Sequence, residues 1–380
     1  MKKKLLFCAC VLLVAAVSHC FSAAAKPAIA GIPGLVIANF PKMDGSDSTE
    51  PLRYIVMCRL LGFDYTWQRR PFTQDPNADI KQVIPNFTCS ESERWFLVDR
   101  VGNSNTHASF EKLIDGQVEL ILVARSISRD EKAVANEKGV TLIEKPIAKD
   151  ALTFMVNNDN PVSDLTIEQI QKIYTGEITN WKEVGGNDSI IHPYVRNANS
   201  GSQEKFETMV MNGLEIMNLP VMYVGLTMTA PYDQIESDYN SIGFTPFYYY
   251  SVIVGNGSTK AIGVNGVPMT QENVKNGAYP FCTDVYAAVR SDIDQNSMAY
   301  KLFQWLTATD GQLVVQESGY VPIDDPSGIS SPLATIGESA TVAYTDLAGR
   351  PCARAQKGIV IETRLDNATH ERSSRLILRR

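Results

Sequence analysis

Three segments of the chain place small hydroxyl residues at the predicted start of a helix. They span residues 44–52, 103–107 and 196–202, and the third runs from an arginine into Ser-Gly-Ser. A helix start offers unpaired backbone N–H groups and a partial positive charge, and hydroxyls add further donors. An arginine can donate two parallel hydrogen bonds to one oxyanion. Taken singly, each segment also fits an ordinary helix cap; if the three helix starts converge, they form a site for a small oxyanion.

The elements that must position these segments alternate between strands and helices. The hydrophobic pattern predicts strands at residues 35–40, 120–124, 152–157, 190–195, 242–244, 261–264 and 285–289. It predicts helices over residues 52–60, 110–114, 166–173 and 300–306, and another that begins at residue 200. Two of these helices open on sequences typical of capping boxes, Thr166-x-x-Gln169 and Ser200-x-x-Gln203. This alternation predicts an α/β fold.

Composition sets the scale of the molecule and excludes one class of partner. The chain has 380 residues, of which 44% are hydrophobic and 20% are charged, so it is globular and long enough for about two lobes. Its formal net charge of −7 argues against broad binding of nucleic acid. The same charge does not exclude a small buried anion, which local dipoles and one arginine can hold.

Residues 1–25 have the parts of an export signal. Three lysines at positions 2–4 precede an apolar stretch, and Ala23–Ala25 form a small-residue cleavage site. Cys20 offers an alternative as a lipidation site, although His19 stands where a small residue is expected. We therefore expect an exported protein, periplasmic or membrane-tethered through Cys20, with a retained membrane anchor as the third alternative.

The cysteines bear on redox chemistry and metal binding. Beyond the export signal the chain has Cys58, Cys89, Cys282 and Cys352. In an exported protein they could form two disulfides in three connectivities. No C-x-x-C pair or His–Cys cluster follows the signal, so we expect no metal site and no cofactor.

Two regions fall outside the α/β pattern. Residues 62–95 contain Pro71, Pro76 and Pro85 and predict an irregular surface insertion. Residues 361–380 carry five arginines and predict a loosely held basic tail, with a docked terminal helix as the alternative.

The most specific run of residues spans 156–166 and 173–181. Further motifs follow in a fixed order, at Arg196 with 200–202, and then at 241–244, 264–267, 303–306 and 311–312. This set resembles the phosphate-binding proteins of bacterial phosphate ABC transporters, the PstS-like family. The resemblance covers roughly residues 35–323, with 62–95 poorly matched.

The resemblance implies the type II periplasmic binding protein fold. In that α/β fold two lobes are joined by hinge crossover strands and enclose a central ligand cleft. Carried onto this chain, it places lobe 1 at residues 28–151 plus 252–360, lobe 2 at 152–251 and the basic tail at 361–380. The hinge strands are then expected near residues 152–156 and 248–254.

The resemblance also implies the residues that contact the ligand. They come from the three helix starts and from the end of the strand at 120–124, and they are Ser46, Ser48, Thr49, the backbone of Glu50, Thr106, Arg125, Ser126, Arg196, Ser200, Gly201 and Ser202.

Two positions depart from the family pattern. Ala198 stands where the family has an acid, and Ala124 stands where another acid often ends the strand. Those acids resemble acceptors for the proton of hydrogen phosphate, so their absence weakens the argument against a fully ionised anion such as sulfate. Arg125 could add a second cation to the cleft or lie on the surface, and Asp47 could supply an acceptor.

The implied function is capture of inorganic phosphate and its delivery to the permease of an ABC transporter by a monomeric extracytoplasmic protein. Alternatives within the same fold are binding of another oxyanion, anion sensing and adhesion. The aromatic run at 244–250 could mark a sugar or partner surface, or a buried hinge or core segment. Catalysis is not favoured, because His107 and His192 accompany no nucleophile elbow, phosphate-binding P-loop or intact G-x-G-x-x-G.

Overall fold

The computed structural model describes residues 27–71, 79–198, 200–254, 257–324, 341–345, 358–365 and 372–379. The predicted export signal and the lipidation site at Cys20 lie outside these residues. No helix within the described ranges combines the length and the apolar character needed to cross a bilayer.

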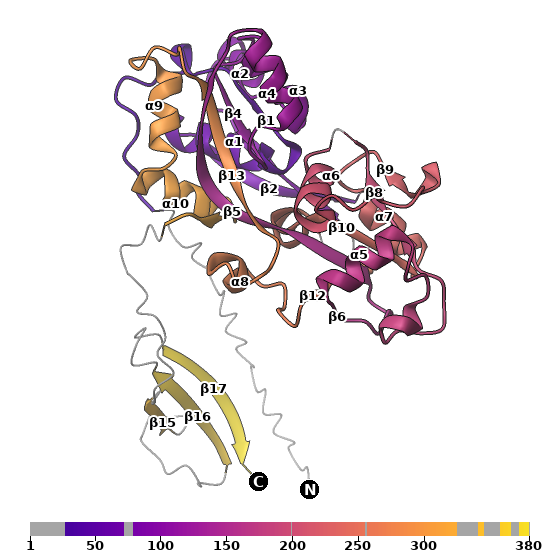
Figure 1. Ribbon diagram of the computed structural model, residues 1–380. Coiled ribbons are helices and arrows are strands. Elements are labelled where there is room, and N and C mark those ends of the chain that lie inside the picture. The colour runs from indigo at the N-terminus through magenta and orange to yellow at the C-terminus, as the bar shows by residue number, and fades with distance from the viewer. Residues whose placement is uncertain are drawn as a thin grey trace, which may run out of the picture.

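A mixed sheet runs through the molecule and continues from one lobe into the other (Figure 1). Its order in the described chain is β1 (Met43–Gly45), β4 (Leu120–Val123), β13 (Cys282–Arg290), β5 (Leu142–Asn157), β10 (Ser241–Pro246) and β7 (His192–Pro193). Two short strands, β11 (Thr259–Ala261) and β14 (Val321–Pro322), also pair with β5. Strands alternate with helices along the chain, which confirms the predicted α/β class.

The first lobe packs helices on both faces of its part of the sheet. They are α1 (Glu50–Leu61), α2 (Glu91–Arg100), α3 (Thr106–Ile114), α4 (Arg129–Glu137), α9 (Met298–Trp305) and α10 (Thr309–Glu317). Helices α1, α9 and α10 share a core with Leu120 and Leu122, and α3 shares another with Ile121 and Val123. In α1, Pro51 occupies the first turn, where its missing N–H leaves no helical bond unmade. Gly62 ends α1 in the left-handed conformation, with φ 77°, and the predicted inner face at Leu52, Ile55 and Val56 is buried.

The second lobe has its own core, rich in aromatic side chains. Its elements are β6 (Asp164–Leu165), α5 (Ile167–Thr175), β8 (Val195–Arg196), α6 (Gly201–Lys205), β9 (Val224–Gly225), α7 (Ala230–Ser237), β12 (Gly263–Val264) and α8 (Gln271–Lys275). Phe154, Tyr174, Phe206 and Phe244 pack together inside it. The two separate cores confirm that the chain forms two lobes.

Short 3-10 and π-helical turns complete the described elements. They are η1 (Ile37–Asn39), η2 (Asp47–Thr49), η3 (Trp181–Val184), η4 (Phe206–Met211), η5 (Val221–Tyr223) and η6 (Tyr249–Ile253). The strand predicted at 35–40 is wrong, because η1 forms there instead. The Asn39 side chain accepts a hydrogen bond from the Val36 N–H and donates one to the Gly34 carbonyl, which stabilises a local turn.

One long strand carries the chain between the lobes. The first part of β5, Leu142 to Ala151, pairs with β13, and its second part, Leu152 to Val156, pairs with β10. The return crossing is β13, where Cys282 lies opposite Ala151. The predicted crossover at 152–156 is therefore part of β5, whereas the second crossover predicted at 248–254 is wrong.

The lobe boundary predicted at residue 252 also needs correction. After the described η6 segment the chain returns to the second lobe, where Ile262, Val264, Val274 and Phe281 are buried in the second core. The reason is that β11 pairs with the last residues of β5. In the described residues the second lobe thus extends to about residue 281.

The aromatic run at 244–250 is buried, as the core interpretation predicted. Phe244 and Phe247 belong to the core of the second lobe, and Tyr248 and Tyr249 belong to that of the first. The Tyr248 ring stacks on Tyr320 with 3.6 Å between centroids. This segment leaves the second lobe and packs on the first, and the chain then returns to the second lobe.

The two regions outside the predicted pattern contain β structure. Strands β2 (Asp64–Pro71) and β3 (Asp79–Asn86) form a hairpin within the insertion at 62–95, so the prediction of an irregular segment is wrong there. In the described C-terminal residues, β15 (Thr341–Thr345), β16 (Gly358–Leu365) and β17 (Arg372–Arg379) form an antiparallel sheet. The tail boundary predicted after residue 360 falls inside β16, and its strands replace the expected loose tail or terminal helix.

The cysteine question is settled in part. No disulfide joins Cys58, Cys89 and Cys282, the three cysteines that the structure describes, and Cys352 lies outside the described residues.

Candidate functional site

The three predicted helix starts meet in a small cavity between the lobes. Its volume is about 40 Å³, enough for roughly three water positions or one compact oxyanion. Lobe 1 contributes Ser46, Asp47, Ser48, Asn105, Thr106 and Ala124, and lobe 2 contributes Arg196, Ser200, Gly201, Ser202, Lys205, Met228 and Pro246. Seven of the eleven residues implied by the family resemblance therefore line one cavity, and Thr49, Glu50, Arg125 and Ser126 do not.

The first loop presents two buried hydroxyls. It follows β1 and turns through η2, which holds the Oγ atoms of Ser46 and Ser48 at 3.4 Å. Thr49 braces this loop from behind, because its Oγ1 donates to the carbonyls of Ser46 and Leu122 and accepts from Arg53 Nη1. Arg53 is fully buried and was not predicted from the sequence, since its position on α1 is that of an ordinary helix residue.

The second loop brings the two lobes into contact. Asn105 adopts φ 69°, and its side chain caps α3 by accepting a hydrogen bond from the Ala108 N–H at 3.1 Å. The next residue, Thr106, faces Gly201 of the second lobe. A Cβ atom at position 201 would lie 2.6 Å from Thr106 Oγ1, which is closer than carbon and oxygen can approach. Glycine at position 201 therefore permits the lobes to meet at the cavity.

The third loop holds the guanidinium of Arg196 in the cavity wall. Arg196 Nε donates to the Gly225 carbonyl at 3.0 Å, and Nη1 lies 3.4 Å from Ser202 Oγ and 3.1 Å from Met228 Sδ. Gln203 does not close the predicted capping box, because its Oε1 accepts from the Arg196 backbone N–H instead. Burial lowers the pKa of Arg196 to about 10, so the side chain is a cation at neutral pH.

A second buried cation lies in the same cavity and was not among the predicted residues. Lys205, at the end of α6, is 3% exposed, and no hydrogen-bond partner for its Nζ is present among the described residues. Burial lowers the pKa of Lys205, and the charge of buried Asp150 opposes that shift. An anion in the cavity would supply the missing partner for Nζ.

Replacement of Lys205 tests this role. We expect Lys205→Met to weaken binding of an oxyanion about 10- to 100-fold, because a hydrogen bond to a charged group contributes about 1.5–3 kcal/mol. The wild-type affinity should also fall as the pH rises through the lowered pKa of Lys205, since the neutral amine no longer attracts the anion, whereas Lys205→Met should lack this loss. Calorimetry at several pH values measures both effects, and an unchanged affinity at neutral pH would contradict the assignment.

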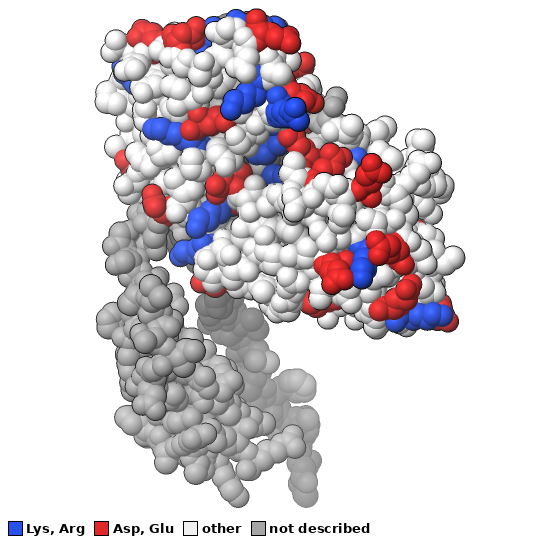
Figure 2. Space-filling view, viewed as in Figure 1, with Lys and Arg blue, Asp and Glu red and all other residues white. Residues whose placement is uncertain are grey.

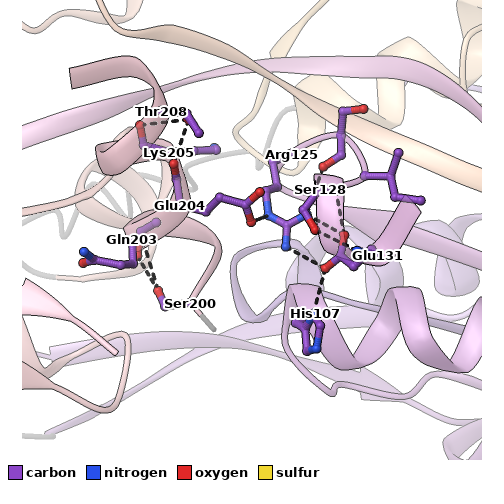
Figure 3. A network of polar contacts seen from close by, with 12 residues as sticks. His107, Arg125, Ser128, Glu131, Ser200, Gln203, Glu204, Lys205 and Thr208 are labelled. Carbon is purple, nitrogen blue, oxygen red and sulfur yellow. Dashed lines mark hydrogen bonds and ion pairs between the residues drawn. The ribbon is translucent and has the colours of Figure 1, made fainter. Parts of the chain in front are cut away.

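Arg125 lies outside the cavity and joins an ion-pair network (Figure 3). Its Nη1 and Nη2 bind the two oxygens of Glu131 at 2.8 and 2.7 Å, and its Nε lies 2.6 Å from Glu204 of the second lobe. His107 also contacts Glu131, with 2.9 Å between Nδ1 and Oε1. Arg125 is therefore neither a free second cation for the cleft nor an exposed arginine, and it links the two lobes beside the cavity.

Three further predicted residues have defined positions. Ser126 donates to Glu144 at 2.8 Å, Glu50 lines a larger neighbouring pocket, and His192 pairs with Asp238 at 2.6 Å. Among the residues that the structure describes, no group of three or more histidine, cysteine or acidic side chains is arranged to hold a metal ion.

The residues that line the cavity include few carboxylates. Ala124 lines the cavity and Ala198 does not, so neither position provides a carboxylate. Among the described residues that line the cavity, Asp47 is the single acid, and its Oδ1 accepts a hydrogen bond from Asn103 Nδ2 at 3.0 Å. The cavity thus combines hydroxyls and two buried cations with one carboxylate at its edge.

A family model described as the PBP superfamily domain matches residues 71–310. This is more than half of the chain, and the chain therefore belongs to this superfamily. The phosphate-binding protein PstS of Bacillus subtilis is 27% identical over 254 residues, which cover 66% of this chain and 74% of that protein. Protein SphX of Synechococcus elongatus is 28% identical over 241 residues, covering 59% and 68%. The predicted resemblance to the PstS-like family is confirmed.

A solved structure of an ABC-type phosphate transport receptor from Vibrio cholerae has the same fold. It superposes with a TM-score of 0.52 at 21% identity and covers 74% of this chain and 99% of that chain. The two-lobed binding-protein fold expected from the sequence is thereby confirmed.

Proposed function

We propose that this protein is an extracytoplasmic solute-binding protein that captures inorganic phosphate between its lobes and delivers it to an ABC transporter permease. The observation that carries the proposal is the cavity where hydroxyls from both lobes meet the buried cations Arg196 and Lys205. Its relatives include several proteins named for phosphate binding. No covalent step is needed, because the lobes replace the hydration shell of the anion with fixed donors.

Lobe contact explains how such a site could hold an anion tightly. Gly201 meets Thr106 across the cavity, and Arg125 meets Glu204 beside it. Exclusion of water lowers the local dielectric constant and strengthens each contact to the anion. On the face shown in Figure 2 acidic and basic side chains are interspersed, without an extended basic surface, which supports a small buried ligand over a polyanion.

Isothermal titration with phosphate, sulfate and arsenate tests the proposal. We expect one phosphate per chain, competition by arsenate and much weaker binding of sulfate. Absence of phosphate binding, or tighter binding of sulfate, would reject inorganic phosphate as the ligand.

Asp47 is the residue expected to separate phosphate from sulfate. Hydrogen phosphate carries a proton that needs an acceptor, and sulfate does not, so the Asp47 carboxylate favours phosphate and repels sulfate. We expect Asp47→Asn to weaken phosphate binding about tenfold and to strengthen sulfate binding, as measured by the ratio of the two dissociation constants. Asp159→Asn, a surface change outside the cavity, is the control. A ratio unaltered in Asp47→Asn would show that selectivity arises elsewhere.

Export and the oligomeric state belong to the same proposal. We infer that the chain is exported, tethered if Cys20 is lipidated, and acts as a monomer, because residues of one chain complete the cavity. Fractionation of cells and light scattering of the purified protein test these two points.

A further inference from the structure

A fully buried arginine lies behind the first loop of the anion cavity. Arg53, on α1, is 0% exposed, and its Nη1 donates to the Ser46 carbonyl at 3.1 Å and to Thr49 Oγ1. Because arginine keeps its charge in proteins, a permanent cation lies beneath the loop without lining the cavity. These contacts use one arm of the guanidinium and leave the other arm, Nη2, for a second partner.

That second partner is Asn103, which connects Arg53 to an acid of the cavity. Arg53 Nη2 donates to Asn103 Oδ1 at 2.7 Å, and Asn103 Nδ2 donates to Asp47 Oδ1 at 3.0 Å. A guanidinium can only donate, so Asn103 must turn its carbonyl oxygen toward Arg53, and its amide N–H groups then face Asp47. A chain of two hydrogen bonds therefore runs from the buried cation to the carboxylate.

The Asp47 carboxylate is held from one side. In the part of the chain that the structure describes, its Oδ1 is bonded to Asn103, and no other residue bonds its Oδ2. Asp47 lines the cavity, and its negative charge opposes the effect of burial, which lowers the pKa of Arg196 in the cavity wall. Asp47 is thus close enough to Arg196 to meet the same anion, with one oxygen still open to a ligand.

We propose, on the basis of the proposed function, that Arg53 and Asn103 are positioning residues that hold the Asp47 carboxylate at the cavity and thereby set the preference for protonated phosphate over sulfate. A carboxylate without this support would turn away from an anion, because like charges repel. Held in place, Asp47 Oδ2 accepts the proton of hydrogen phosphate, which sulfate lacks. Neither Arg53 nor Asn103 lines the cavity, so their effect on the ligand passes through Asp47.

Replacement of Asn103 breaks the chain of hydrogen bonds and leaves the first loop in place. Asn103 is exposed, and the contacts of Arg53 Nη1 with the loop do not involve it. We expect Asn103→Ala to bind phosphate about 5- to 10-fold more weakly and to bind sulfate no more weakly than the wild type does, as measured by isothermal titration. Asn136→Ala, at an exposed position on α4, is the matched control and should alter neither affinity.

A double-mutant cycle separates positioning from general damage to the site. In Asp47→Asn the carboxylate is already lost, so adding Asn103→Ala should change the ratio of the phosphate and sulfate dissociation constants less than twofold. A second loss as large as that of Asn103→Ala alone would show that Asn103 acts through another group, and would contradict the inference.

Arg53→Lys tests the buried end of the chain. Lysine keeps the positive charge but lacks the planar fork that joins the loop to Asn103, so we expect the phosphate preference to fall as it does in Asn103→Ala. Thermal unfolding without ligand shows whether this variant folds. A folded Arg53→Lys protein with the wild-type preference would remove Arg53 from the mechanism.

The outcomes distinguish this inference from the proposed function. If the wild-type protein binds phosphate and its preference over sulfate is unchanged in Asp47→Asn or in Asn103→Ala, the inference fails while phosphate capture stands. If the wild-type protein does not bind phosphate, the proposed function itself fails.

Discussion

Replacement of Arg196 by alanine is expected to weaken phosphate binding roughly a hundredfold or more. Arg196 is 7% exposed and lines the cavity, and its guanidinium is held in place by the Gly225 carbonyl. Its loss removes a charged donor from a buried site, where such a bond is worth about 3 kcal/mol. The phosphate would then face the cost of burial with one fewer countercharge.

The design separates loss of binding from loss of folding. Calorimetry gives the dissociation constant, and thermal unfolding without ligand shows whether the variant still folds. Arg196→Lys keeps the charge but loses the planar fork, so an intermediate affinity is expected. Arg129→Ala, at an exposed position on α4, is the matched control and should bind as the wild type does. An affinity unchanged in Arg196→Ala would show that the anion lies elsewhere.

The second large effect is expected on stability, from Arg125→Ala. Glu131 is 1% exposed, and both of its oxygens accept from the Arg125 guanidinium, besides the Ser128 N–H and the contact with His107. Removal of Arg125 leaves the buried Glu131 charge with the Ser128 N–H and His107 but without its guanidinium partner, and breaking a buried ion pair costs about 3 kcal/mol. We therefore expect the free energy of unfolding to fall by about that amount, as measured in urea.

The pH dependence of unfolding identifies the cause. Burial alone would raise the pKa of Glu131, but the hydrogen bonds and charge of Arg125 lower it below its ordinary value of 4.5. The stabilisation is thus complete above that ordinary value and is lost as the pH falls through the lowered pKa. Arg125→Ala should lack this acid-side loss, and an unchanged profile would exclude the ion pair as its source.

A milder variant isolates the contact between lobes. Glu204→Gln leaves the Arg125–Glu131 pair intact and removes the charge that Arg125 meets across the cleft at 2.6 Å. We expect little change in the free energy of unfolding but a few-fold loss of phosphate affinity, because lobe closure loses a contact. Equal stability losses in Glu204→Gln and Arg125→Ala would contradict this division of roles.

The comparison of sequence with structure separates local from long-range causes. The helix starts at Ser46, Thr106 and Ser200 could be recognised because capping and turn formation depend on a few neighbouring residues. The capping box at Thr166 and Gln169 formed for the same reason. Arg196 could be assigned from its fixed distance to Ser-Gly-Ser. By itself, the sequence determined the α/β class, the three loops and the main cation of the cavity.

Tertiary structure decided which residues from distant parts of the chain lie beside those loops. Lys205 occupies an ordinary helix position, and only packing against the other lobe buries it beside the cavity. Arg125 shares its local sequence with surface arginines, yet Glu204, remote in sequence, fixes it between the lobes. The return of residues 259–281 to the second lobe likewise depends on a strand partner distant in sequence, because Thr259 pairs with Asn157. Burial and long-range pairing are properties of the folded chain, and no local pattern encodes them uniquely.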